Sequence, residues 1–248
     1  MSKLMDWVIN WIGSGVKRWW LDFDGDSSYA DCGADASLED LPGGSGFTID
    51  CWIKVPDEQL AHYGTIASKY DTIQEVSWGW YFVIDYDTAT LGGVAIFQTI
   101  PAGSNTNQMI LVEDWTHVLM CFNPVDAKLY IAIDGAWCTY SVQTAAVGVI
   151  GTDASIPFLM GALLQDSAPT SWLRGGIQWL RLSTGVRYEI GVEFIPPDMC
   201  PPPDVDGITI EIWALDEGTG PTLHANVHDP TNNGTMTDYA WYACEEEE

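Results

Sequence analysis

The sequence predicts an all-β fold: an antiparallel β-sandwich (jelly roll) preceded by a short N-terminal arm. Three observations favour it. Short segments of alternating apolar and polar residues recur through residues 19–195, turn residues separate them, and long helical patterns are absent. About a dozen such strands are typical of a sandwich. A chain of 248 residues suits one large all-β domain, which at this size buries roughly 70–75% of its unfolded surface.

The N-terminal arm, residues 1–18, is the first element. Its apolar residues recur at helical spacing, at Leu4, Trp7, Val8, Trp11 and Ile12. Two interpretations stay open: a helix folded back on its own domain, or an arm that docks on a neighbouring protein. Asp6 interrupts the apolar stretch, and no run is long enough for a signal core or a membrane span. The sequence therefore predicts no secretory signal.

The strands of residues 19–195 follow. In residues 47–55 one face is predicted to carry Phe47, Ile49, Cys51, Ile53 and Val55. The other face carries Thr48, Asp50, Trp52 and Lys54. Residues 115–137 read as a hairpin around the turn "NPVDA". Strand-like segments of this kind continue to about residue 195.

The last part of the chain begins with a Pro-rich connector, residues 196–206, which cannot be helix or central strand. Residues 207–244 contain one more strand and a polar loop, and residues 245–248 form an acidic tail. A separate domain of about 45 residues without helices would be only marginally stable. We therefore expect the connector to run extended and to return the chain to the same sandwich.

Several segments, in their order along the chain, resemble the laminin-G-like, concanavalin A-like jelly roll family. They are "LDFDGDSSYADCGADASLED", "FTIDCWIKV", "GTIASKYD", "GWYFVID", "DWTHVLMCFNPVDAKLYIAIDG", "GGIQWLRLSTGVRY" and the C-terminal "IEIWALDEGTG…HDPTNNGT…AW". The resemblance implies a laminin-G-like sandwich. It says little about activity, because this fold hosts many unrelated functions.

Charge and cysteine content narrow the function classes. The chain has 35 acidic and 9 basic residues, a net charge of −26, which disfavours binding to nucleic acid and to anionic membranes. No C-x-x-C pair is present among the six cysteines, so a zinc site is not expected. Cys200 and Cys244 bracket the C-terminal segment and are the candidate disulfide pair.

No residue is predicted to be catalytic. A retaining glycosidase needs two carboxylates on one face of a cleft. The nearest candidates are Glu211, Asp216 and Glu217, but their spacing and Gly218 break the required alternation. The four histidines, His62, His117, His224 and His228, accompany no G-x-S-x-G motif, and His117 is expected to be a half-buried strand residue.

Two loops are rich in oxygen ligands of the kind calcium prefers. One contributes Asp24 and Asp26, and the other contributes Asp229, Asn232 and Asn233. If the C-terminal strand pairs beside the opening strand, the two loops would meet at one edge, where members of the resembling family bind calcium. The structural alternative is that these residues form turns by bonding to their own backbone.

The tryptophans leave sugar binding open. Thirteen are present; exposed aromatic faces stack on sugars, whereas aromatic residues inside a sandwich form its core.

The sequence therefore predicts a non-enzymatic virion protein at the particle surface, such as a capsid decoration protein, which binds a viral protein lattice as a homo-oligomer. The alternative is a carbohydrate-binding adhesion module, and a glycoside hydrolase ranks third. Calcium is the one cofactor considered.

Overall fold

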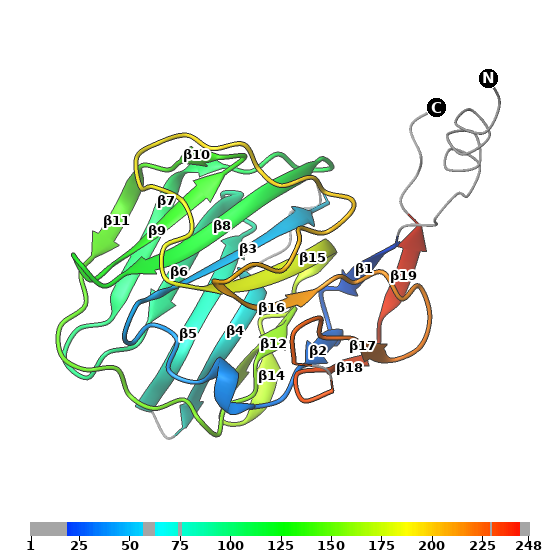
Figure 1. The fold of residues 1–248 in the computed structure, drawn as a ribbon, viewed down its shortest axis with the longest axis horizontal. Coiled ribbons are helices and arrows are strands. Elements are labelled where there is room, and N and C mark those ends of the chain that lie inside the picture. The colour runs from blue at the N-terminus through cyan, green and yellow to red at the C-terminus, as the bar shows by residue number, and fades with distance from the viewer. Residues whose placement is uncertain (1–18, 57–62, 74–75, 229, 244–248) are drawn as a thin grey trace.

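The computed structural model describes residues 19–56, 63–73, 76–228 and 230–243 (Figure 1). Within these residues, the strands form two large antiparallel sheets that pack face to face, called sheet A and sheet B below. The predicted all-β antiparallel sandwich is confirmed. The same residues contain no helix long and apolar enough to cross a membrane.

Sheet A has eight strands within the described residues. Its order is β10 (Ala136–Trp137), β9 (Lys128–Ile133), β8 (Trp115–Asn123), β3 (Phe47–Lys54), β15 (Arg174–Thr184), β1 (Trp19–Asp24) and β19 (Ala240–Ala243), with β16 (Thr209–Trp213) also paired to β15. The hairpin predicted around "NPVDA" is confirmed by the pairing of β8 with β9.

Sheet B has nine strands in the same described part of the chain. Its order is β11 (Tyr140–Thr144), β7 (Ala102–Met109), β6 (Thr90–Ala95), β5 (Val76–Asp85), β4 (Tyr63–Ile73), β12 (Leu159–Met160), β2 (Tyr29–Asp31), β18 (Gly234–Thr237) and β17 (Thr222–Leu223). A separate ribbon pairs β13 (Leu163–Gln165) with β14 (Ala168–Thr170), and a single 3-10 turn covers Ala36–Leu38.

The core lies between the two sheets. The predicted inner face of β3 is confirmed, because its alternate apolar residues are all buried. Phe47 of sheet A packs on Trp80 of sheet B with ring centroids 4.7 Å apart. The sheets approach closely at Gly93, where an added Cβ would lie 2.2 Å from the Met120 sulfur. Gly93 thus lets the Met120 side chain of sheet A pack directly on the backbone of sheet B.

A β-bulge in β15 changes which of its residues face the interior of the sandwich. Ile177 pairs with Ile53, but Leu180 pairs with Cys51, so β15 carries one extra residue. Ile177 and Leu180 can therefore both be buried in the interior. Trp179, which lies inside the bulge, donates its indole N–H outward to the Asp198 carbonyl.

The C-terminal segment adds strands to both sheets. In sheet A, β16 pairs with β15 and β19 pairs with β1. In sheet B, β18 pairs with β2. Residues 207–243 are therefore part of the sandwich built by the residues before them.

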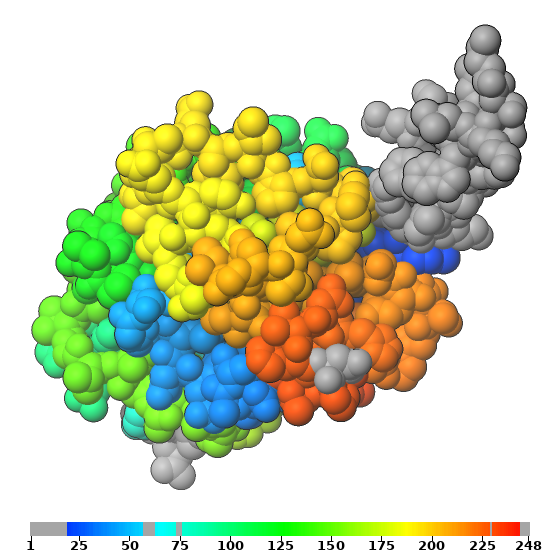
Figure 2. Space-filling model, in the orientation of Figure 1, coloured from blue at the N-terminus to red at the C-terminus, as the bar shows by residue number. Residues whose placement is uncertain are grey.

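Residues 186–206, called the strap below, contain no regular strand or helix and run across the outer face of sheet A. Figure 2 shows them, in yellow and light orange, spread over this side of the molecule. As a consequence part of the outer face of β3 is also buried: Thr48 and Asp50 are fully buried, whereas Trp52 and Lys54 are partly exposed. His117, expected to be half-buried, is also completely enclosed.

Candidate functional site

The outer face of sheet B carries a hollow of about 290 Å³ at the end of β4 to β7 and β11. It is lined by Tyr63, Asp85, Thr88, Thr90, Leu91, Gly92, Asn105, Thr106, Asn107 and Ser141. We refer to it as the hollow. Its volume falls at the lower end of the roughly 300–1,000 Å³ found for small-molecule sites.

Strand register explains why these side chains share one face. Tyr63, Asp85 and Thr90 lie opposite one another on β4, β5 and β6. Two residues further along β6, Gly92 lies opposite Asn105 of β7. Residues paired across a sheet, and residues two apart on a strand, project from the same face. The side chains of these strands therefore surround a position where β6 has only a glycine.

Gly92 forms the floor of the hollow because it has no side chain. A Cβ added there would lie 2.8 Å from Oδ1 of Asn105 and 3.5 Å from Val83. Beside it, β7 bulges, since residues 106–108 oppose the single residue Leu91. The bulge is held locally: the Thr106 hydroxyl accepts from the Leu91 N–H at 3.1 Å and donates to the Gln108 carbonyl at 2.9 Å.

Several polar groups of the hollow have spare hydrogen-bonding capacity. Within the described residues, neither the Asn105 side-chain amide nor the Tyr63 hydroxyl has a hydrogen-bond partner. Tyr63 is 57% exposed. Asp85 accepts the Asp87 N–H on Oδ1 at 3.0 Å, which leaves Oδ2 as a further acceptor. An aromatic ring, an amide and a carboxylate thus meet around an open floor.

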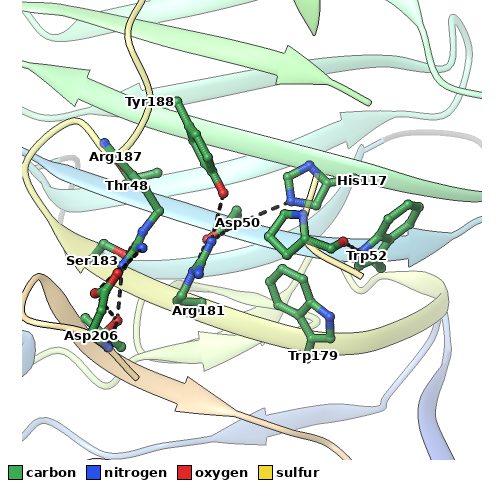
Figure 3. A network of polar contacts seen from close by, with 12 residues as sticks. Thr48, Asp50, Trp52, His117, Trp179, Arg181, Ser183, Arg187, Tyr188 and Asp206 are labelled. Atoms are coloured by element: carbon green, nitrogen blue, oxygen red, sulfur yellow. Dashed lines mark hydrogen bonds and ion pairs between the residues drawn. The ribbon is translucent and has the colours of Figure 1, made fainter. Parts of the chain in front are cut away.

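The outer face of sheet A carries a different polar cluster, which the strap seals (Figure 3). The Arg181 guanidinium donates to both oxygens of Asp50, at 2.9 and 2.5 Å, and to the Tyr188 hydroxyl at 3.0 Å. His117 Nε2 lies 3.4 Å from Asp50 Oδ2. Burial alone would raise the pKa of Asp50, but the His117 ring and the Arg181 guanidinium hold that pKa below its usual value.

Indole N–H groups fasten the strap onto this cluster. Trp52 donates to the Pro197 carbonyl at 3.0 Å and Trp179 to that of Asp198 at 3.2 Å. Trp137 donates to the carbonyls of Glu189 and Val192. These bonds satisfy backbone acceptors of a segment that has no ladder partners. The cluster therefore holds the strap in place and has no open face for a ligand.

The polar loop predicted near the C-terminus is hydrogen-bonded to Glu211. This fully buried carboxylate accepts the N–H groups of Val227 at 2.7 Å and His228 at 2.9 Å, and the Asn232 amide at 3.1 Å. Trp213, two residues on, donates its indole N–H to the Asn232 carbonyl at 2.8 Å. Glu211 thus organises the loop that follows β17.

The same contacts decide whether Glu211 and Glu217, the nearest candidates for catalytic carboxylates, have free oxygens. Both oxygens of Glu211 are occupied by the bonds of its own loop. Glu217 accepts the His224 N–H on Oε1 at 2.6 Å, and burial raises its pKa. His228 packs its Nδ1 3.3 Å from Glu211. Glu211 therefore has no accessible oxygen to act on a glycosidic bond, and the absence of catalytic residues stays a prediction.

The predicted calcium ligands among the described residues are not brought together. Although β18 and β19 pair beside β2 and β1, Thr235 lies opposite Asp31 and Thr237 opposite Tyr29. Residues 24–26 thus precede one end of β2, whereas residues 232–233 adjoin the other end.

The side-chain oxygens of Asp24 and Asn233 accept backbone N–H groups, whereas Oδ1 of Asn232 has no hydrogen-bond partner within the described residues. Burial works against ionisation of Asp24, but N–H groups of Ser27, Asp26 and Ser28 lower its pKa. Asn233 Oδ1 accepts the Ala225 N–H at 2.9 Å. The predicted ligands among the described residues do not fit one calcium site, and these residues contain no cluster of three metal-binding side chains. Asp229 lies outside the described residues, and calcium binding stays a prediction.

Other predicted residues cannot be placed. The docking residues Leu4, Trp7, Val8, Trp11 and Ile12 lie outside the described residues, as do His62 and Cys244. The Cys200–Cys244 bridge therefore stays a prediction.

None of the residues that line the hollow was predicted from the sequence as a binding residue. Tryptophans were the candidates for sugar contact, but Trp80, Trp179 and Trp213 are fully buried. A signal was present in "AGSNTNQM", where Gly103, Asn105 and Asn107 alternate at the period of a strand. Only the pairing with Gly92 shows that this polar face borders a gap.

Comparison with known proteins supports the fold alone. No protein-family model and no curated protein sequence matches the chain. Among solved structures, it is similar to a candidate carbohydrate-binding protein of Bacteroides ovatus ATCC 8483, with 15% identity and a TM-score of 0.60. That match covers 93% of this chain and 61% of the other, so this chain spans less than two thirds of the other protein's length.

Two further matches are partial. The NanB sialidase of Streptococcus pneumoniae is 13% identical with a TM-score of 0.50, over 71% of this chain and 27% of the sialidase. Domains LG4-5 of the mouse laminin α1 chain are 13% identical with a TM-score of 0.47, over 68% of this chain and 42% of the laminin fragment. The matches with TM-scores of 0.60 and 0.50 show that this chain shares the β-sandwich fold.

Proposed function

We propose that this protein is a non-catalytic carbohydrate-binding module and that the hollow on the outer face of sheet B holds the glycan. The observation that carries the proposal is the set of unpartnered groups around Gly92. Sugars present apolar ring faces together with hydroxyl groups that both donate and accept. The Tyr63 ring offers a surface for stacking, and Asn105 and Asp85 offer hydrogen bonds.

The fold is compatible with this role. One solved structure with the same architecture is a candidate carbohydrate-binding protein. Because that similarity extends only to the fold, the proposal depends on the side chains of this chain. The hollow is concave, largely preformed by strands, and contains a few convergent polar groups, which are general properties of small-ligand sites.

The test is a glycan array followed by calorimetry with the best ligand. Gly92→Val would fill the floor, and Tyr63→Ala would remove the stacking surface; both should weaken binding at least roughly tenfold. Tyr242→Ala is the matched control, because Tyr242 is 48% exposed but lies on β19 of sheet A. Thermal melts check that each variant is folded. Glycan affinity that both hollow variants leave unchanged would refute the proposal.

The virion decoration role predicted from sequence is the second candidate function. The net charge of −26 and the apolar spacing of residues 1–18 favour docking on a protein lattice with a basic surface. Co-sedimentation with assembled capsids tests it, and deletion of residues 1–18 should abolish binding. Glycan binding without any capsid affinity would eliminate this candidate and leave the adhesion role.

A further inference from the structure

We infer that the hollow selects the neutral end of a glycan and rejects sugars that carry a carboxylate, such as sialic or uronic acids. This inference rests on the proposed function. Charge is the first observation: among the described residues that line the hollow, Asp85 supplies the one carboxylate, and none is lysine, arginine or histidine.

The basic residues of the described part of the chain all lie elsewhere. Lys69 is fully buried, where its ammonium donates to the carbonyls of Asp153 and Ile156. Arg181 is committed to Asp50 and Arg187 to Asp206. The remaining three belong to sheet A: Lys54 ends β3, Lys128 begins β9 and Arg174 begins β15. None of them lines the hollow.

An acidic sugar would therefore meet no counter-charge. Placing its carboxylate in the hollow would remove water from a charge without supplying an ion-pair partner, which is costly. The carboxylate of Asp85 would repel it at short range, and the net charge of −26 adds a long-range repulsive field. Both contributions act in the same direction, so acidic ligands should bind more weakly than neutral ones.

A neutral sugar fits the same groups. Asp85 Oδ2 can accept from a sugar hydroxyl, and a bond to a charged acceptor is stronger than one to a neutral acceptor. Asn105 can donate through its NH₂ and accept through Oδ1. The volume of about 290 Å³ suits a short terminal portion of a glycan rather than a long chain.

The experiment compares a neutral oligosaccharide with its sialylated counterpart by calorimetry on the full chain. We expect the sialylated form to bind roughly tenfold more weakly or worse, and this ratio to shrink at high salt. Asp85→Asn should lower affinity for the neutral form. Thr88→Lys adds a cation at the rim without removing Asp85, and it should narrow the ratio between the two ligands.

The outcomes separate the two proposals. Equal affinity for both ligands, weakened in each case by Gly92→Val, would overturn the inference and leave carbohydrate binding at the hollow intact. Affinity that Gly92→Val does not change would place the glycan elsewhere and overturn the proposed function itself. A preference for the neutral form that Thr88→Lys leaves unchanged, in a variant that melts like the wild type, would show that charge does not set the selectivity.

Discussion

The two outer faces of this sandwich carry similar kinds of residue, but these residues are covered on sheet A and uncovered on sheet B. On sheet A, aromatic and charged side chains face the strap: Trp52 and Trp179 donate to its carbonyls, and Arg181 donates to Asp50. On sheet B, an aromatic ring, an amide and a carboxylate surround a floor made by Gly92 and remain open. Residue type alone therefore does not make a site: a polar cluster that is covered contributes to stability, whereas one that is uncovered can bind a ligand.

The largest expected effect comes from breaking the covered cluster. Arg181→Met would leave Asp50 as an uncompensated buried charge, which costs about 3–5 kcal/mol of unfolding free energy. Chemical denaturation measures this loss. The double variant Asp50→Leu with Arg181→Leu should recover part of it, because no lone charge remains. A single variant as stable as the wild type would contradict this account of the pair.

The next effect concerns the indole bonds of the strap. Trp52→Phe keeps most of the ring but removes the N–H that donates to the Pro197 carbonyl, so we expect a loss of about 1–3 kcal/mol in unfolding free energy. Trp115→Phe serves as the control, since within the described residues the Trp115 indole has no hydrogen-bond partner. Equal losses in the two variants would mean that packing, and not the hydrogen bond, secures the strap.

On the uncovered face the effect should fall on binding instead. Asn105→Ala removes an exposed side chain without an internal partner, so stability should stay within about 0.5 kcal/mol of the wild type. Glycan affinity, measured by calorimetry, should fall roughly tenfold. Asn226→Ala, another exposed asparagine in the C-terminal segment, should change neither. A destabilised Asn105→Ala variant would contradict the prediction that this uncovered side chain contributes to binding and not to stability.

The smallest effect is expected at the rim of the strap. Hydrogen bonds from Arg187 lower the pKa of Asp206, whose side chain is 49% exposed, so Asp206→Asn should cost at most about 1 kcal/mol. A carboxyl with a depressed folded-state pKa stabilises above its unfolded pKa of about 3.9 and loses that contribution as the pH falls. The difference between variant and wild type in thermal melts should therefore begin to shrink near pH 4 and vanish only well below it, as the pH falls through the depressed folded-state pKa. A difference that persists in acid would argue against the ion pair.

Local patterns in the sequence were sufficient for part of the strands. The alternation through Phe47, Ile49 and Cys51 predicted the inner face of β3, and "NPVDA" predicted the hairpin of β8 and β9. Strand periodicity and turn chemistry act over a few residues, so they can be read directly from the chain. The sequence also indicated that the Pro-rich segment would run extended, since proline cannot join a central ladder.

The tertiary structure decided what covers each face. Arg181 bonds to Asp50, 131 residues away in sequence, and to Tyr188, 7 residues away. Only the path of the strap makes these three residues a buried cluster. Glu211 becomes the centre of the C-terminal loop because the chain folds back over β16. The hollow exists because β6 has Gly92 at the position that lies beside Asn105 of β7. Each of these features depends on the register between strands and on which segment lies over which sheet, and no local pattern encodes either.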